Sequence, residues 1–260
     1  MLQPITAYQE REKLLVRGLG GATTNVNLLR RYAELLAEVG RMQNAATYAA
    51  RAAASAPLDS EAAATKANLE AAAGALPTAQ ADATDALRTW PTQPAVWTYG
   101  TFIAMWSSDW TRADDLLSRP NLTTGAKAVQ LLRTCVDGLR KREPAKVAAA
   151  QRVARAVGAL DQVRLRWAIQ CVAQLGLEDT AFELAAQYLT EAYAFDGPAT
   201  FFYPSTTGMR RDRRFMPLMA KLGLVDYWRS TGKWPDFCSE PGLPYDCKAE
   251  AAKYAGGRRG

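Results

Sequence analysis

The chain has 260 residues, of which 48% are hydrophobic and 22% charged, and a formal net charge of +6. Such a chain is long and apolar enough to bury a continuous core without metal or disulfides. It contains no histidine, which excludes imidazole-based catalytic triads, acid–base pairs that use imidazole, and the usual zinc sites. Lysine and carboxylate chemistry is not excluded, but Asp114 with Asp115 and Glu34 with Glu38 lie at the spacings of exposed helix faces. We expect no metal site, no cofactor and no enzyme activity.

The N-terminal residues Met1 to Pro4 lack the basic segment and apolar run of a secretory signal. No stretch of about 18 or more residues is purely apolar, so the sequence predicts no membrane-spanning segment. We expect a cytoplasmic protein, or a periplasmic one if the chain is part of a longer, membrane-anchored polypeptide.

Residues 1–25 are predicted to form a leading helix and a connector. Gly18, Gly20 and Gly21 make a glycine-rich stretch, but it ends without the Lys-Ser or Lys-Thr of a phosphate-binding loop. We interpret it as a helix terminator.

From residue 26 the chain repeats itself every 34 residues. The clearest landmarks are the pairs Gly40 and Gly74, Ala45 and Ala79, Ala52 and Ala86, and Pro57 and Pro91. Self-similarity at this period is typical of stacked helix pairs, because one pair cannot bury its apolar face alone. Residues 26–195 divide into five units without insertion, at 26–59, 60–93, 94–127, 128–161 and 162–195.

Small residues recur where the two helices of a unit, or neighbouring units, would cross. We expect them to lie buried and to let backbones approach closely: Ala33, Ala45, Ala67, Ala79 and Ala181. Glycine recurs where the first helix of a unit ends, because a residue past a helix terminus often needs positive φ. These glycines are Gly40, Gly74 and Gly176.

The series Leu29, Tyr32, Ala33, Leu36, Gly40, Ala45, Ala52 and Pro57 resembles the tetratricopeptide repeat signature. The resemblance covers about two thirds of the chain and implies an all-α, right-handed superhelical solenoid of about five helix pairs. It departs at Pro120, which replaces an alanine, and at Arg142 and Pro144, which replace the turn glycine and an aromatic residue. We expect the third and fourth units to be irregular. The RNA-reading pentatricopeptide repeat is a weaker fit.

In proteins of this family the first helix of each unit lines the concave side, and its second, fifth, ninth, twelfth and thirteenth places contact ligands. The resemblance implies that a peptide contacts Asn27, Arg30, Glu34, Asn68, Thr98, Phe102, Met105, Trp106, Arg140, Arg166 and Gln170. Such a groove suits an extended or helical peptide with an apolar anchor near the third unit. The alternative is that the large apolar residues of that unit only pack against neighbouring helices.

After the repeats we expect a connector at 196–211, a helical segment at 212–254 and a flexible tail at 255–260. Trp234-Pro235-Asp236-Phe237-Cys238 and related aromatic motifs resemble the block that follows tetratricopeptide arrays in proteobacterial signalling regulators. We expect the segment to cap the fifth unit. Its large apolar side chains should be buried there: Phe215, Leu222, Tyr227, Trp228 and Trp234.

The four cysteines fall into two pairs of different character. Cys238 and Cys247 flank a turn-rich segment, which favours a disulfide, with two free thiols as the alternative. Cys135 and Cys171 lie inside predicted helices, and we interpret them as separate buried apolar side chains.

Two functional hypotheses follow. The first is a non-catalytic scaffold that binds a protein or peptide on its concave face. The second is the C-terminal sensory or regulatory part of a larger transcriptional or nucleotide-cyclase regulator, in which ligand binding or self-association biases an output domain. The basic cluster Arg210, Arg211, Arg213 and Arg214 is interpreted as solvated or locally ion-paired, so we expect no direct binding of nucleic acid.

Overall fold

The computed structural model describes residues 8–21, 24–119, 125–190 and 197–254. The predicted flexible tail at 255–260, the start of the leading helix and Pro120 lie outside these ranges. Every regular element within them is an α-helix or a 3-10 helix. Among the described residues, no helix is both long and apolar enough to cross a membrane.

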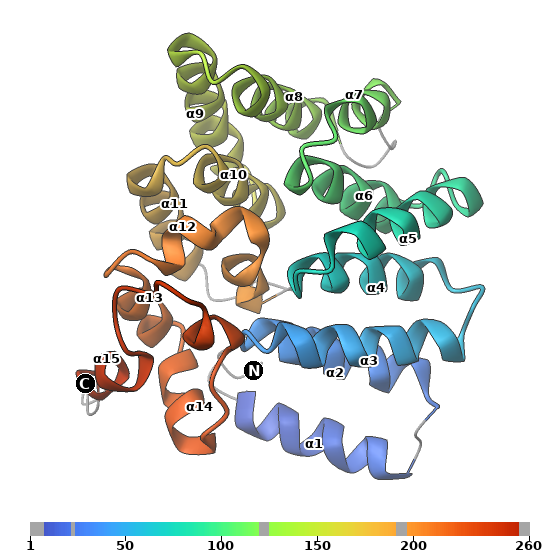
Figure 1. The fold of residues 1–260 in the computed structure, drawn as a ribbon, viewed down its shortest axis with the longest axis vertical. Helices are drawn as coiled ribbons and strands as arrows, with labels where there is room; N and C mark the ends of the chain where they lie inside the picture. Colours follow the sequence, from blue (N-terminus) through green and yellow to red (C-terminus); the bar gives the residue numbers. More distant parts are fainter. Residues whose placement is uncertain (1–7, 22–23, 120–124, 191–196, 255–260) are drawn as a thin grey trace.

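A leading helix, α1 (Tyr8–Gly21), precedes five helix pairs that stack in chain order (Figure 1). The first helices of the pairs are α2 (Val26–Glu38), α4 (Ser60–Ala72), α6 (Pro94–Trp106), α8 (Ala126–Lys141) and α10 (Gln162–Gln174). The second helices are α3 (Met42–Ser55), α5 (Leu76–Thr89), α7 (Trp110–Ser118), α9 (Pro144–Gly158) and α11 (Glu178–Thr190). Four first helices begin at the predicted residue and α8 begins two residues earlier, so the predicted all-α solenoid is confirmed.

The turn inside each pair keeps its backbone conformation even where the sequence signature fails. Positive φ recurs every 34 residues, with values of +79°, +91°, +58°, +54° and +79° at Gly40, Gly74, Ser108, Arg142 and Gly176. Ser108 and Arg142 adopt this region at a steric cost that glycine avoids. The third pair is irregular as expected, since α7 has 9 residues where α3 and α5 have 14. The fourth pair, with helices of 16 and 15 residues, shows no such shortening.

The small residues expected at helix crossings are buried. Ala33, Ala45, Ala79 and Ala181 are 0% exposed, and Ala67 is 1% exposed. A larger side chain at these positions would push two helices apart.

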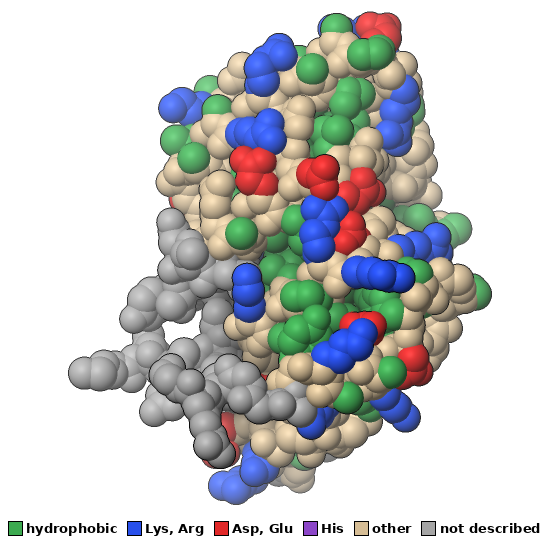
Figure 2. All heavy atoms as spheres, turned by 90° about the vertical axis from the view of Figure 1, so that its left-hand side faces the viewer, with side chains coloured by type: hydrophobic (Ala, Val, Ile, Leu, Met, Phe, Trp, Pro, Cys, Tyr) green, Lys and Arg blue, Asp and Glu red, His purple; other side chains and the backbone are tan. Residues whose placement is uncertain are grey.

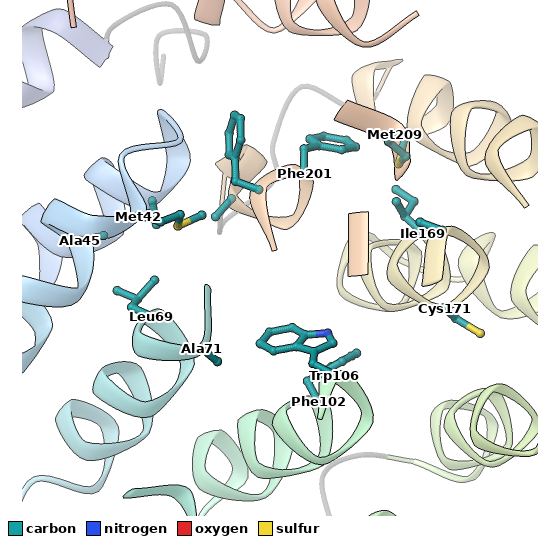
Figure 3. Close-up of a cluster of buried hydrophobic side chains, with 14 of the residues drawn as sticks. Met42, Ala45, Leu69, Ala71, Phe102, Trp106, Ile169, Cys171, Phe201 and Met209 are labelled. Carbon is teal, nitrogen blue, oxygen red and sulfur yellow. The ribbon is translucent and has the colours of Figure 1, made fainter. Parts of the chain in front are cut away.

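The chain after the repeats, residues 197–254, is here called the closing block. It contains η2 (Gly197–Phe202), η3 (Pro204–Thr206), α12 (Thr207–Arg210), α13 (Phe215–Lys221), α14 (Leu224–Thr231), η4 (Asp236–Ser239) and α15 (Cys247–Ala252). Its first part enters the array, so that Phe201 lies between Met42 of α3 and Ile169 of α10, and Met209 lies beside Ile169 (Figure 3). The closing block therefore completes the core of the array.

The closing block bridges both ends of the array, which corrects the expectation that it covers the fifth pair alone. Its start does contact that pair, because α12 packs on α10 and α11 and Arg214 forms a 2.7 Å ion pair with Asp179. Its later part lies on α1 and the first pair, where the Trp228 indole donates a 2.9 Å hydrogen bond to the Val39 carbonyl. Four of the five large side chains are buried as predicted, and Trp234 is half-buried.

The contact with α1 is built around one buried carboxylate. Glu12, 4% exposed, accepts a 2.9 Å hydrogen bond from the Tyr227 hydroxyl and forms ion pairs with Arg41 and Lys233 at 3.6 and 2.8 Å. Burial, and then the negative charge of Glu12, hold the pKa of Tyr227 well above its usual range. Tyr227 is therefore a neutral donor that ties α14 to α1.

The cysteines form two disulfides in the structure. Cys238 is bonded to Cys247 within the closing block, with Cα atoms 5.8 Å apart. Cys135 and Cys171 are buried as expected, but they are not separate apolar side chains. They lie face to face on α8 and α10, with Cα atoms 5.7 Å apart, and are bonded to each other. This pairing was not predicted, because it joins two different repeat units, 36 residues apart in the chain.

Candidate functional site

A pocket of about 310 Å³ opens on the inner side of the array. Its walls come from α1, from the first helices α2, α4, α6 and α10, and from the η2 segment with Tyr203. α8 contributes no residue to the wall among those described. The pocket therefore lies between the first, second, third and fifth pairs, where the array curves around the closing block.

Seven of the eleven residues predicted to contact a ligand line this pocket: Glu34, Asn68, Thr98, Phe102, Trp106, Arg166 and Gln170. The other four lie elsewhere. Asn27 is exposed and Met105 is 1% exposed in the core. Arg30 forms an ion pair with Glu61 of the next unit, and Arg140 forms one with Asp114 at 2.5 Å. These two arginines therefore stabilise neighbouring pairs.

Aromatic rings form one continuous wall. Phe102 lies 5.6 Å from Trp167 and 6.0 Å from Trp106, measured between ring centroids. Trp106 in turn lies 5.3 Å from Tyr203 of the closing block. These separations are typical of tilted and edge-to-face aromatic pairs, which hold their rings in defined orientations.

The inner end of the pocket is polar and joins the array to the closing block. The Asn68 side-chain amide donates a 3.2 Å hydrogen bond to the Tyr203 hydroxyl. The Ser205 hydroxyl donates a 3.3 Å hydrogen bond to the Gln170 amide oxygen. Asn68 and Gln170 are 3% and 5% exposed. Asn68 and Gln170, both predicted to contact a ligand, thus each form one hydrogen bond with the closing block.

Charged residues at the rim are arranged as ion pairs. Arg11 of α1 contacts Glu38 at 2.6 Å, and Arg31 contacts Glu34 at 3.0 Å. Burial alone would lower the pKa of Arg11, but the hydrogen bond and charge of Glu38 outweigh it and raise that pKa. Each of these two carboxylates therefore faces a cation of the same chain.

The sequence prediction missed several wall residues. Arg31, Thr65, Tyr99 and Trp167 all occupy the sixth place of their units, a place that the family pattern leaves out. Counting that place would have found them. Thr200 and Tyr203 belong to a segment without periodicity, and no local signal places them inside the array.

The chemistry of the wall suits non-covalent binding. Its polar groups are amides, hydroxyls, ion-paired carboxylates and arginines. In the described part of the chain, no group of three or more Cys, Asp or Glu side chains is placed to hold a metal ion.

The outer surface of the molecule is mixed in charge on the face seen in Figure 2, where Lys and Arg side chains are interspersed with Asp and Glu.

A second cavity, of about 460 Å³, lies between the turns of the first two pairs and the closing block. Its charged groups form contacts within the closing block and between that block and the first pair. Arg210, 6% exposed, contacts Glu240 at 3.2 Å and donates to the Tyr203 carbonyl at 3.1 Å. Asp236 accepts a 2.8 Å hydrogen bond from the Gln43 backbone N–H and so caps α3. We interpret this cavity as part of the junction.

Comparison with known proteins gives little sequence similarity. No family model matches the chain, and no curated protein matches it. Among solved structures, the chain is similar to a tetratricopeptide repeat protein from Parabacteroides merdae ATCC 43184, with 13% sequence identity and a TM-score of 0.47. The similarity covers 94% of this chain and 90% of that one. The assignment as an all-α solenoid of helix pairs therefore depends on the geometry of the pairs described above.

Proposed function

We propose that the protein is a non-catalytic scaffold that binds a segment of a partner protein in the inner pocket. The observation that carries this proposal is the convergence of side chains from four first helices, α2, α4, α6 and α10, on one aromatic-walled pocket. Pockets of a few hundred Å³ that combine apolar walls with a few polar groups are typical binding sites.

The closing block limits what can bind. Phe201 and Phe202 are 0% and 4% exposed, and they fill the space that an open array of this kind would offer to a long ligand. We therefore infer that the pocket receives one short part of a partner, such as a single anchor side chain with its flanking backbone. A helix lying along the whole concave face does not fit this geometry.

The absence of catalysis is part of the proposal, and the ion pairs support it. The two carboxylates of the wall, Glu34 and Glu38, lie beside arginines. In each pair the carboxylate already contacts a guanidinium group of the same chain, so it is engaged in holding the wall together.

A displayed peptide library, selected on the intact chain, tests the proposal. We expect enriched peptides to lose binding when Trp167, a half-buried wall residue, is changed to Ala. The matched control is Trp90→Ala, a half-buried tryptophan outside the pocket. Equal losses in both variants, or no loss in either, would contradict the proposed site.

A regulatory module is the second candidate, and one observation favours it. Arg11 of α1 forms part of the pocket wall and contacts Glu38, so an occupant of the pocket would act on α1 directly. Hydrogen exchange of α1, measured with and without a selected peptide, tests this role. Unchanged exchange in α1 on binding would count against regulation through that helix.

A further inference from the structure

Three buried polar atoms around the inner pocket have no hydrogen-bond partner among the described residues. They are Asn68 Oδ1, Trp106 Nε1 and Thr200 Oγ1. The three residues are 3%, 9% and 3% exposed and all line the pocket. Leaving a buried donor or acceptor unpaired costs free energy, so such atoms are uncommon and call for an explanation.

Two of these three residues, Asn68 and Trp106, contact one side chain, that of Tyr203. Its hydroxyl accepts a hydrogen bond from the Asn68 amide at 3.2 Å, and its ring packs on Trp106 with a centroid distance of 5.3 Å. Thr200 belongs to η2, three residues before Tyr203 in the chain, and lines the same pocket. The chain itself thus shows that this part of the pocket accepts a phenol ring.

The backbone of Tyr203 is held by contacts that do not involve its ring. The Tyr203 carbonyl accepts hydrogen bonds from the Arg210 guanidinium and the Thr206 backbone N–H, both at 3.1 Å. The residue is only half-buried, and its side chain covers the Asn68 amide and the Trp106 ring. Displacement of the Tyr203 side chain would uncover both groups.

We infer that the pocket recognises a tyrosine side chain of the partner, which displaces the Tyr203 ring. The inference rests on the proposed function and names the anchor. The incoming hydroxyl takes the place of the Tyr203 hydroxyl at Asn68, and the flanking peptide groups supply partners for the unpaired atoms. An aliphatic anchor has no polar atom for this place, and a lysine finds its counter-charges, Glu34 and Glu38, already paired.

Small probes test the choice of anchor on the intact chain. We would titrate N-acetyl-L-tyrosinamide, N-acetyl-L-phenylalaninamide and N-acetyl-L-leucinamide by ligand-observed NMR. The tyrosine probe is expected to bind about fivefold more tightly than the phenylalanine probe, because one hydrogen bond is gained. Equal binding of these two probes overturns the inference.

Variants test the displacement. Tyr203→Ala removes the internal competitor and is expected to tighten binding of the tyrosine probe. Tyr203→Phe keeps the ring, loses the bond to Asn68 and is expected to tighten it less. The alanine variant leaves a void in the core. If that variant does not fold, the phenylalanine variant tests the displacement instead. Weaker binding in the folded variant overturns the inference.

Two further substitutions separate recognition from structure. Thr200→Val removes one unpaired polar atom at nearly constant volume, so its melting temperature is expected to stay the same or rise, while the tyrosine probe binds about fivefold more weakly. Trp106→Phe removes another unpaired atom but also leaves a void, so its melting temperature is expected to fall, while the probe is weakened by a similar factor. Trp90→Phe is the matched control and is expected to change neither quantity. Unchanged binding in both pocket variants overturns the inference.

The peptide library distinguishes this inference from the proposed function. Enriched peptides that depend on Trp167 and carry tyrosine support both. Enriched peptides that depend on Trp167 but carry no tyrosine overturn the choice of anchor and leave the proposed function in place. A library without any peptide that depends on Trp167 overturns both.

Discussion

The first two helix pairs and the closing block are stabilised in different ways. In the pairs, each helix packs mainly on its neighbours in the chain, and small residues such as Ala45 and Ala79 set the spacing. In the closing block, the decisive contacts join residues far apart in sequence. The hydrogen bonds of Trp228 to Val39, of Gln43 to Asp236 and of Tyr227 to Glu12 span 189, 193 and 215 residues.

This difference shows which kind of structure a repeat pattern specifies. A repeat encodes contacts between neighbouring units, which recur at a fixed spacing. A bridge between the two ends of an array occurs once and leaves no period in the sequence. Substitutions in the closing block and in the helix pairs test how much each kind of contact stabilises the fold.

The largest loss of stability is expected from Trp228→Ala. The Trp228 side chain is 0% exposed, packs against Phe202, Trp234 and Phe237, and bonds to Val39. The truncation should lower the free energy of unfolding by about 3–5 kcal/mol, measured by urea denaturation. Trp234→Ala, at a half-buried site in the same block, is the control and should cost less. Equal losses in the two variants would show that the burial of Trp228 between the closing block and the first pair does not determine the loss of stability.

The disulfide of the closing block should have the next largest effect. Replacing both Cys238 and Cys247 by Ala releases a crosslink across 9 residues and is expected to cost about 2–3 kcal/mol by the chain-entropy estimate. Urea denaturation without reductant measures it. Two free thiols at these positions in the native protein, found by alkylation and mass analysis, would contradict the premise.

Within the repeats, Ala45→Leu should overpack a crossing. Ala45 is 0% exposed, and added methylene groups in a close-packed crossing are expected to cost about 1–3 kcal/mol. Ala54→Leu makes the same change at an exposed position of the same helix, α3, and should be nearly neutral. A thermal melt that treats both variants alike would contradict the assigned crossing.

The smallest predicted effect is a pH dependence in the second pair. Burial, followed by the hydrogen bond and charge of Asp82, raises the pKa of Glu70 from 4.5 to about 7. The folded chain then holds this proton at pH values where the unfolded chain releases it, so stability falls as pH rises from about 4.5 to about 7.

Glu70→Gln should flatten this decline and be more stable than the wild type near pH 8. Urea denaturation across that pH range measures both. Asp85→Asn, in an exposed ion pair of α5, is the control and should leave the pH profile unchanged. A profile that Glu70→Gln does not alter would assign the decline to another group.

Much of the fold could be predicted because its causes are local and periodic. Gly40 and Gly74 mark turns that need positive φ, and Ala33, Ala45 and Ala67 mark crossings that need small side chains. Ser108 and Arg142 carry no such mark. Their turns form because the packing of the flanking helices imposes the conformation.

The site could be predicted only in part. The positions taken over from the tetratricopeptide resemblance include Asn68, Phe102 and Gln170, which line the pocket. Spacing does not reveal where a long side chain ends, and Arg30 reaches sideways to Glu61. It also does not reveal Tyr203, which reaches the pocket through tertiary contacts of the closing block.

The bridge has a consequence for how this protein can change in evolution. An open array tolerates the gain or loss of a whole repeat, because each unit contacts only its neighbours. Here one segment must touch both the fifth pair, through Arg214 and Asp179, and α1, through Tyr227 and Glu12. Insertion of a sixth pair would move these two anchoring points apart, and deletion of one would bring them into collision. The number of repeats is therefore set by the reach of the closing block.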